Sequence, residues 1–218
     1  CRLEGAVQAA FQAYDRRSYS GVQGWLRDLR QAFGKDSAEV AMEQRLITTP
    51  GTQFLPMSQL VAAQLVTHGA PANAVHLLYN AVDLEHFHPS GPARAKRAEW
   101  RARWGVPEDA VVALFVAHNL RLKNLALAMT VVERLHREFP PLHLVVVGKR
   151  APPRRAPWLH WAGACTAMDE VNAAGDLLLH PTWYDAFANV VLEAMASGLA
   201  VLVSQDAGAA ELLDGHNG

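Results

Sequence analysis

The sequence predicts an α/β protein whose parallel sheet is covered by helices on both faces. From residue 111 onward, short apolar runs alternate with segments of helical spacing. Most of these runs are apolar throughout rather than alternating with polar residues, which is typical of strands buried on both faces. Strands that alternate with helices form βαβ units, and such units build a parallel sheet.

The part of the chain before this alternation is predicted to be mainly helical. Residues 5–46 mix charged and apolar side chains at helical spacing. Ser58 is a suitable N-cap for a helix over 59–68, and Gly69 is a suitable stop. Two short apolar segments are predicted to be strands: 46–49 and 75–79.

The alternation itself follows a linker at 89–93 and a basic helix at 94–104. The predicted strands are 111–117, 142–147, 158–161, 177–180 and 199–204. The predicted helices are 123–139, 168–174, 189–197 and one that begins at 209. Three prolines and four basic residues between 149 and 157 exclude a helix interior and predict a loop.

The composition excludes several classes of protein. Half of the 218 residues are hydrophobic and 19% are charged, which is typical of a globular rather than a disordered chain. A formal net charge of −1 argues against a nucleic-acid partner. Cys1 and Cys165 form no C-x-x-C pair, and a reducing cytoplasm fits them. No apolar run reaches the roughly 18–20 residues of a membrane-spanning helix, and both ends are expected to be cuts in a longer protein.

Polar residues that follow predicted strands are the first candidates for a site, because ligands of open parallel sheets bind at the carboxyl ends of strands. His118, Asn119, Arg121 and Lys123 follow the first such strand. A lysine at a helix start is unfavourable for the helix dipole unless an anion binds there, and its ammonium is a compact phosphate ligand. From the residues alone, Lys123 is either a solvated surface lysine or a phosphate-binding one.

Two carboxylates follow the strand at 177–180. Asp185 lies in the loop and Glu193 lies about one turn into the next helix, so both can face one cleft. Their neighbours are apolar, and an unpaired buried charge is costly. The two carboxylates therefore either pair locally with an arginine or bind a ligand. Paired carboxylates also occur in hydrolases, an alternative that the phosphate-type signal at Lys123 argues against.

Several motifs, in order along the chain, resemble glycosyltransferase family 4. Residues 180–201 read HPTWYDAFANVVLEAMASGLAV and resemble the E-x7-E region of that family. Residues 79–83 read YNAVD and resemble its interdomain segment. Residues 114–125 resemble its first C-domain strand, loop and lysine, and residues 208–218 resemble the next helix and turn. The resemblance covers about residues 45–218 and is closest to lipopolysaccharide-core and related bacterial transferases.

This resemblance implies a GT-B fold of two Rossmann-like domains. Residues 1–89 would be the end of the N-terminal, acceptor-side domain with the interdomain segment, and residues 90–218 would be a truncated C-terminal, nucleotide-sugar-binding domain. The early N-terminal strands and the final C-terminal helices of the family would lie outside the sequence. Two alternatives within this fold stay open: a non-catalytic nucleotide-sugar-binding fragment and a nucleotide-sugar epimerase.

The resemblance also assigns roles to individual residues. Glu193 would hold the ribose hydroxyls, and Asp185 would contact the donor sugar with a side chain one methylene shorter than the usual glutamate. Lys123, supported by Arg121, would bind the donor diphosphate. The implied catalytic residues are Asp185, Lys123 and Arg121, and the implied donor-binding residues are Glu193, Ala186, Phe187, Ala188, Asn189 and His118. The amides of residues 186–189, at a helix N-terminus, would favour the departing phosphate. Asn124 and Ala188 stand where the family often has glycine.

The implied activity is transfer of a sugar from a nucleotide-diphosphate donor to a glycan or lipid-linked acceptor. It would proceed with retention, in the synthesis of lipopolysaccharide or another cell-envelope polysaccharide. The sequence contains no Asp-x-Asp motif, so neither a metal nor a further cofactor is expected. The basic amphipathic regions 16–35 and 94–104 are either solvated helix faces or peripheral contacts with the inner face of an anionic membrane.

Overall fold

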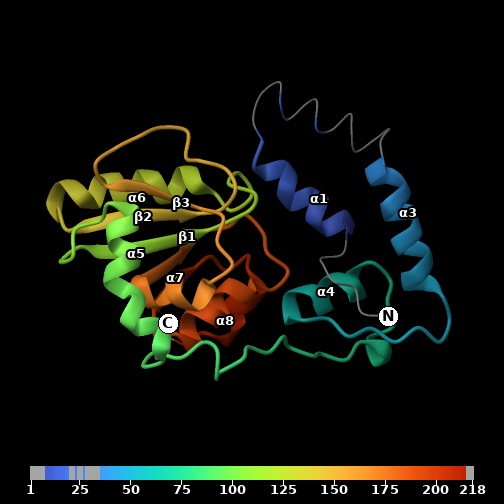
Figure 1. Cartoon of the computed structure of the whole chain (residues 1–218). Coiled ribbons are helices and arrows are strands. Elements are labelled where there is room, and N and C mark those ends of the chain that lie inside the picture. The colour runs from blue at the N-terminus through green and yellow to red at the C-terminus, as the bar shows by residue number, and fades with distance from the viewer. Residues whose placement is uncertain (1–7, 20–22, 24–26, 28–34, 215–218) are drawn as a thin grey trace. The chain divides into compact units, whose positions relative to one another are not determined.

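A computed structural model of the chain describes residues 8–19, 23, 27 and 35–214 (Figure 1). The chain packs into two units. The first unit consists of Cys1–Asn80, Trp183–Ala188 and Gln205–Leu212, and the second consists of Ala81–Thr182, Asn189–Ser204 and Leu213–Gly218. The prediction that residue 89 separates an acceptor-side domain from a donor-binding domain concerns their roles and stays a prediction.

The second unit is built on a five-stranded parallel sheet with the order β3-β2-β1-β4-β5. The strands are β1 (Val111–Val116), β2 (Leu142–Val147), β3 (Leu159–Gly163), β4 (Leu177–His180) and β5 (Ala200–Val203). The strand order changes direction between β1 and β4, which creates a topological switch point at their carboxyl ends. All five predicted strands are present to within two residues, and the predicted α/β fold class is confirmed.

Helices cover both faces of this sheet (Figure 1). α6 (Leu125–Glu138) lies on one face, and α5 (Arg97–Trp104), α7 (Met168–Ala174) and α8 (Asn189–Ala196) lie on the other. The predicted basic helix begins with a 3-10 turn, η2 (Pro92–Lys96), and continues as α5. The apolar side chains of α6 recur at helical spacing and pack on β1 and β2, and their burial stabilises the unit.

The predicted helix at 123–139 begins two residues later than expected. Asn124 has φ 59° and ψ 48°, which is the left-handed region, and α6 starts at Leu125. Asparagine tolerates this conformation better than most non-glycine residues do. Lys123 therefore lies in the turn before α6 and not in its first turn.

The amino edge of the sheet is held by a partly buried network of two arginines and Asp176. Arg101 is 3% exposed and bonds to Asp176 over 2.7 Å. Arg97 bonds to the other oxygen of the same carboxylate. Burial raises the pKa of Asp176, but the Val112 N–H and Arg97 outweigh this and lower its pKa overall. This network fixes α5 against the start of β1 and β4.

The first unit is mainly helical where it is described. Its helices are α1 (Gln8–Arg17), α3 (Lys35–Thr48), α4 (Gln59–Thr67), η1 (Ala72–Ala74) and η3 (Gly208–Leu212). Ser58 caps α4 as predicted, because its Oγ accepts a hydrogen bond from Val61 N over 3.1 Å. Gly69, with φ 103°, follows the end of this helix as expected. Residues 20–22, 24–26 and 28–34 of the predicted helical region lie outside the described residues.

Two predicted elements of this unit are wrong in type. Residues 46–48 end α3 instead of forming a strand: Ile47 is 1% exposed in the helix packing, and Thr48 Oγ1 donates to Gln44 O over 2.8 Å. Residues 75–79 form a single isolated bridge, between Val75 and Phe54, instead of the predicted strand. The helix predicted to begin at 209 is present as the short 3-10 helix η3. Short apolar segments are ambiguous between strand and helix, and tertiary packing decided these cases.

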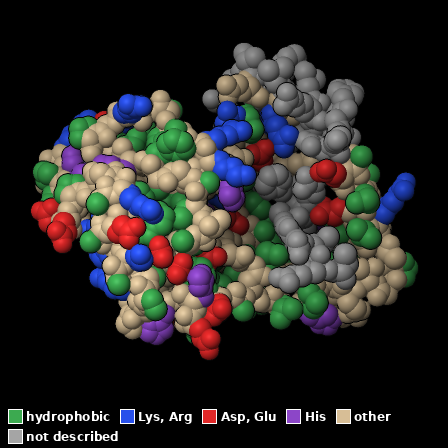
Figure 2. All heavy atoms as spheres, in the orientation of Figure 1, with side chains coloured by type: hydrophobic (Ala, Val, Ile, Leu, Met, Phe, Trp, Pro, Cys, Tyr) green, Lys and Arg blue, Asp and Glu red, His purple; other side chains and the backbone are tan. Residues whose placement is uncertain are grey.

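No helix in the described part of the chain is long and apolar enough to cross a membrane. Basic and acidic side chains share the face drawn in Figure 2, as the small net charge predicts. The two basic amphipathic regions therefore stay candidates for either solvated faces or membrane contacts.

Candidate functional site

The loop between β1 and α6 carries the side chains expected to bind phosphate. Asn119 organises this loop: its Oδ1 accepts from Leu122 N over 3.1 Å, and its carbonyl accepts from Lys123 N over 3.0 Å. Leu122 is buried, Arg121 is exposed and Lys123 is half-buried. His118 is exposed at the start of the same loop. The structure thus brings these three expected residues to the carboxyl end of β1, beside the switch point.

The end of β4 is tied to this loop by Thr182. Its Oγ1 donates to the carbonyl of Leu122 over 3.1 Å, and its own carbonyl accepts from Ser204 Oγ over 2.7 Å. Thr182 is 3% exposed, and fully paired buried groups rigidify the segments that carry them. Sequence reasoning assigned no role to Thr182, because a threonine after a strand is common in many proteins.

Glu193 lies in the second turn of α8 and is half-buried. Its carboxylate makes no hydrogen bond or ion pair with any described residue. Burial raises the pKa of its carboxyl group, and the nearby His86 opposes this rise. A half-buried carboxylate without hydrogen-bond donors has unused capacity to accept bonds from a ligand.

His86 is a site neighbour that sequence reasoning did not identify. Its Nε2 lies 3.6 Å from Asp169 Oδ1, and its proximity opposes the rise in the pKa of Glu193. It follows the YNAVD segment, which was expected to connect two domains. Glu193 lies more than a hundred residues further along the sequence, so no local pattern links the two side chains.

Asp185 belongs to the first unit, whereas Glu193 belongs to the second. The backbone of Asp185 bonds on both sides to the segment after β5, to Asp206 O over 3.0 Å and from Gly208 N over 2.9 Å. Its Oδ1 accepts from Phe187 N over 3.2 Å, which closes a local turn. The prediction that Asp185 and Glu193 face one cleft is not tested by the packing within either unit and stays a prediction.

The segment expected to present backbone amides, residues 186–189, is firmly anchored. Ser58 Oγ donates to Ala186 O over 2.7 Å, and Ala209 N donates to Phe187 O over 2.6 Å. Phe187 is 2% exposed, and its ring centroid lies 6.1 Å from that of Tyr79. The amide of Phe187 already donates to Asp185, so in this arrangement it is not available to a phosphate. Sequence reasoning treated Ser58 only as a helix cap and missed this second contact.

Ala188 adopts a backbone conformation that alanine normally avoids. Its φ is 73°, in the left-handed region, at the residue directly before α8. The methyl group at this φ costs about 1–2 kcal/mol. An alanine therefore adopts a conformation that favours glycine, at a position where the resembled family often has glycine, and Asn189 follows as the exposed first residue of α8.

No three His, Cys, Asp or Glu side chains gather into a candidate metal site among the described residues. An apolar hollow of about 290 Å³ lies beside α6, β4 and β5, but none of the expected site residues lines it. Its walls carry almost no polar groups, and a nucleotide needs several. The hollow is therefore not the expected donor site.

Comparison with known proteins identifies several relatives. A family model described as glycosyl transferases group 1 matches residues 110–218. A D-inositol 3-phosphate glycosyltransferase of Streptomyces bingchenggensis is 28% identical over 208 residues, which are 84% of this chain and 44% of that protein. An alpha-maltose-1-phosphate synthase of Mycobacterium tuberculosis is 27% identical over 162 residues, which are 67% of this chain and 41% of that protein. The chain thus spans less than half the length of these curated relatives.

Solved structures share the fold. WaaG, a glycosyltransferase involved in lipopolysaccharide biosynthesis, superposes with a TM-score of 0.70 at 22% identity, over 84% of this chain and 53% of that one. Anabaena HepE in complex with UDP and glucose superposes with a TM-score of 0.68 at 18% identity, over 81% and 50%. At these identities the likeness shows the fold alone. It confirms the predicted GT-B fold for the portion that this chain covers.

Proposed function

Because the chain belongs to the group 1 glycosyl transferases, we propose that the protein transfers a sugar from a nucleotide-diphosphate donor to a glycan or lipid-linked acceptor. The reaction retains anomeric configuration and uses neither a metal nor a further cofactor. It serves lipopolysaccharide or other cell-envelope polysaccharide synthesis, in the cytoplasm at the inner face of the membrane. The likeness to WaaG supports the setting, and the UDP bound by HepE supports the class of donor.

The observation that carries this proposal is the state of Glu193. It is half-buried, its carboxylate has no hydrogen-bond donor among the described residues, and the pKa of that carboxylate is raised by burial. Such a carboxylate is unfavourable for folding alone and becomes favourable when a ligand donates hydrogen bonds to it. Two adjacent ribose hydroxyls are donors of this kind, which agrees with the role that the E-x7-E resemblance implies.

The proposed chemistry is electrostatic. As the bond between the sugar and the diphosphate breaks, negative charge builds on the leaving phosphate. Lys123 and Arg121, held by the turn around Asn119, stabilise that charge. Asp185 orients the sugar, and positioning of the two substrates supplies much of the remaining acceleration.

Nucleotide titration tests the donor site. Calorimetry with UDP, GDP and ADP is expected to give binding with one of them. Glu193→Ala should weaken that binding by about 10–100-fold, because a hydrogen bond to a charged group contributes about 1.5–3 kcal/mol. Glu138→Ala, at an exposed carboxylate at the end of α6, is the matched control and should bind normally. Lys123→Ala with Arg134→Ala as its exposed control completes the set.

A second function, nucleotide-sugar binding without transfer, is favoured by one observation. The Phe187 amide donates to Asp185, so one of the amides expected to receive the leaving phosphate is occupied. Transfer of radiolabelled sugar to a lipid extract distinguishes the two functions. Binding of the donor with no transfer and no donor hydrolysis would support the binding function and contradict the transferase.

A further inference from the structure

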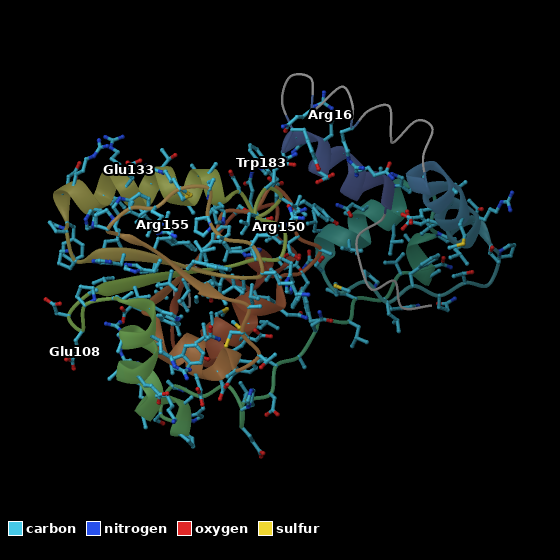
Figure 3. All side chains as sticks on the ribbon, turned by 45° about the horizontal axis from the view of Figure 1, so that its top comes forward. Arg16, Glu108, Glu133, Arg150, Arg155 and Trp183 are labelled. Atoms are coloured by element: carbon cyan, nitrogen blue, oxygen red, sulfur yellow. The ribbon has the colours of Figure 1, made fainter. Side chains whose placement is uncertain are left out.

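In the second unit, the segments that follow β1, β2 and β3 at the carboxyl edge of the sheet carry only positive charge. The segments after β1, β2 and β3, residues 117–124, 148–150 and 164–167, contain no Asp or Glu, whereas Asp185 follows β4 and Asp206 follows β5. These three segments contain four cations: Arg121, Lys123, Lys149 and Arg150. Acidic residues lie at the opposite edge, where Glu108 precedes β1 and Asp176 precedes β4. Figure 3 shows Glu108 and Arg150 at opposite ends of the strands.

The loop after β2 starts directly beside the loop after β1. The two strands pair in register up to Val116 and Val147. A Cβ atom on Gly148 would lie 2.1 Å from Ala117 O, so only glycine allows this approach. Gly148 is also held on its other side, because its N–H donates to Gly163 O over 2.8 Å and its carbonyl accepts from Trp161 Nε1 over 3.0 Å. The backbone that leads into Lys149 and Arg150 is therefore fixed next to the loop of Lys123.

Lys149 and Arg150 differ from most other cations of this unit in having no acidic partner. Arg97 and Arg101 pair with Asp176, Lys96 and Arg103 pair with Glu99, and Arg137 and Arg154 pair with Glu133. Lys149 and Arg150 are exposed and form no ion pair with any described residue. Uncompensated cations on a fixed loop, next to the β1 loop that borders the switch point, provide an attractive site for an anion.

The second half of the same loop contains an arginine that is paired with an acidic residue. Arg154 bonds to both oxygens of Glu133 on α6, over 3.1 and 2.6 Å, and its guanidinium lies 5.3 Å from the ring centroid of Trp158. This pairing holds the chain as it returns toward the start of β3. Arg155 is exposed and unpaired like Arg150, yet it lies away from Arg150 toward the other end of the strands (Figure 3).

We infer that Lys149 and Arg150 bind the phosphate groups of the donor, together with Arg121 and Lys123, as one anion-binding surface formed by the loops after β1 and β2. This inference rests on the proposed function and extends it from one loop to two. The basic Pro-rich segment 149–157 then has two roles. Its first two residues contact the ligand, and Arg154 fixes the return of the chain.

Calorimetry on the whole protein tests this inference with three probes: UDP, UMP and inorganic pyrophosphate, or the corresponding phosphates of GDP or ADP if one of those binds instead. The double substitution Lys149→Ala/Arg150→Ala should weaken diphosphate and pyrophosphate binding at least tenfold and UMP binding less. It should also reduce the dependence of the diphosphate affinity on salt concentration. Arg155→Ala is the matched control and should change neither.

The possible outcomes separate the two proposals. If Glu193→Ala abolishes diphosphate binding while the double variant binds all three probes as the parent does, the proposed function stands and the inference on the second loop is overturned. If the parent binds no nucleotide and no pyrophosphate, both fail. Thermal unfolding without ligand should be unchanged in the double variant, because both side chains are exposed. A large loss of stability would contradict their assignment as ligand-binding residues.

Discussion

Thr182 donates a hydrogen bond across the switch point to the carbonyl of Leu122, over 3.1 Å, from the end of β4 to the turn that carries Lys123. Replacement by valine keeps the shape of the side chain and removes the donor, which leaves a buried carbonyl without this bond. We expect Thr182→Val to lower the free energy of unfolding by about 1–2 kcal/mol. We also expect weaker nucleotide binding, because the turn is less well held.

Chemical denaturation and calorimetry measure these two effects. Thr130→Val is the matched control, since Thr130 makes a comparable hydroxyl contact with Ala126 O on the exposed surface of α6. Equal stability of the parent and Thr182→Val would show that the contact does not hold the turn.

Glu193→Gln should stabilise the protein while it impairs binding. Burial raises the pKa of Glu193 in the folded chain, so the contribution of this group to stability is greatest at low pH and is lost as pH rises through the folded pKa. At neutral pH the neutral glutamine avoids the cost of a half-buried charge. We expect a melting temperature about 2 °C higher for the variant at pH 7, with weaker nucleotide binding.

The same comparison at acidic pH provides a check on the cause. The advantage of Glu193→Gln should shrink as pH falls toward about 4.5, where the parent carboxyl is protonated. An advantage that is equal at all pH values would mean that burial of the charge is not its source.

Ala188→Gly should also raise stability. Alanine at φ 73° carries a strain that glycine lacks. Glycine loses more entropy on folding, and this offsets part of the gain. We expect a net increase of about 0.5–1 kcal/mol in the free energy of unfolding, measured by denaturation. Ala186→Gly, two residues earlier where the backbone φ is not positive, should instead be destabilising.

Two histidines make the second unit sensitive to mild acid. His160 Nδ1 lies 2.9 Å from Trp104 O and must donate to it, which leaves Nε2 to accept from His143 Nδ1 at 2.8 Å. Protonation of either ring disturbs this arrangement. Burial lowers the pKa of both, and His160 and His136 lower that of His143 further, while Asp109 opposes the shift. The stability that they contribute is therefore complete above about pH 6.5 and is lost as pH falls below it.

Denaturation at pH 7.5 and 5.5 should show this loss in the parent protein. The drop should be smaller in His143→Leu, which has no proton to gain at this position. His88→Gln, at an exposed histidine, should retain the full drop. A parent stability that does not change between these two pH values would contradict the assignment.

The sheet could be predicted because its strands are short, continuous apolar runs bounded by polar turns, and each run needs burial on both faces. The segments at 46–49 and 75–79 are also short apolar runs, but they do not form strands. Ile47 completes the buried side of α3, whereas Leu77 and Leu78 are 40% and 56% exposed and find no neighbouring strand beyond the bridge at Val75. Local composition does not determine whether such a run becomes a strand, because that depends on which surface packs against it.

Part of the candidate site could likewise be predicted from the sequence, and part could not. Lys123, Arg121 and Glu193 could be found from their place after strands and from the motif. The approach of Gly148 to Ala117, the contact of Thr182 with Leu122 and the effect of His86 on Glu193 join residues far apart in the sequence. They depend on strand order, which no local pattern encodes.

The repeated passage of the chain between its two units limits how the gene can be shortened. A polypeptide that starts at residue 81 still carries residues 183–188 and 205–212, which pack in the first unit. Tyr184 and Phe187, 1% and 2% exposed in the intact chain, would then be stripped of packing partners such as Gln64 and Tyr79. Such a product should aggregate or require a solubilising fusion. Removal of the N-terminal residues is therefore a damaging truncation and not a clean excision of one domain.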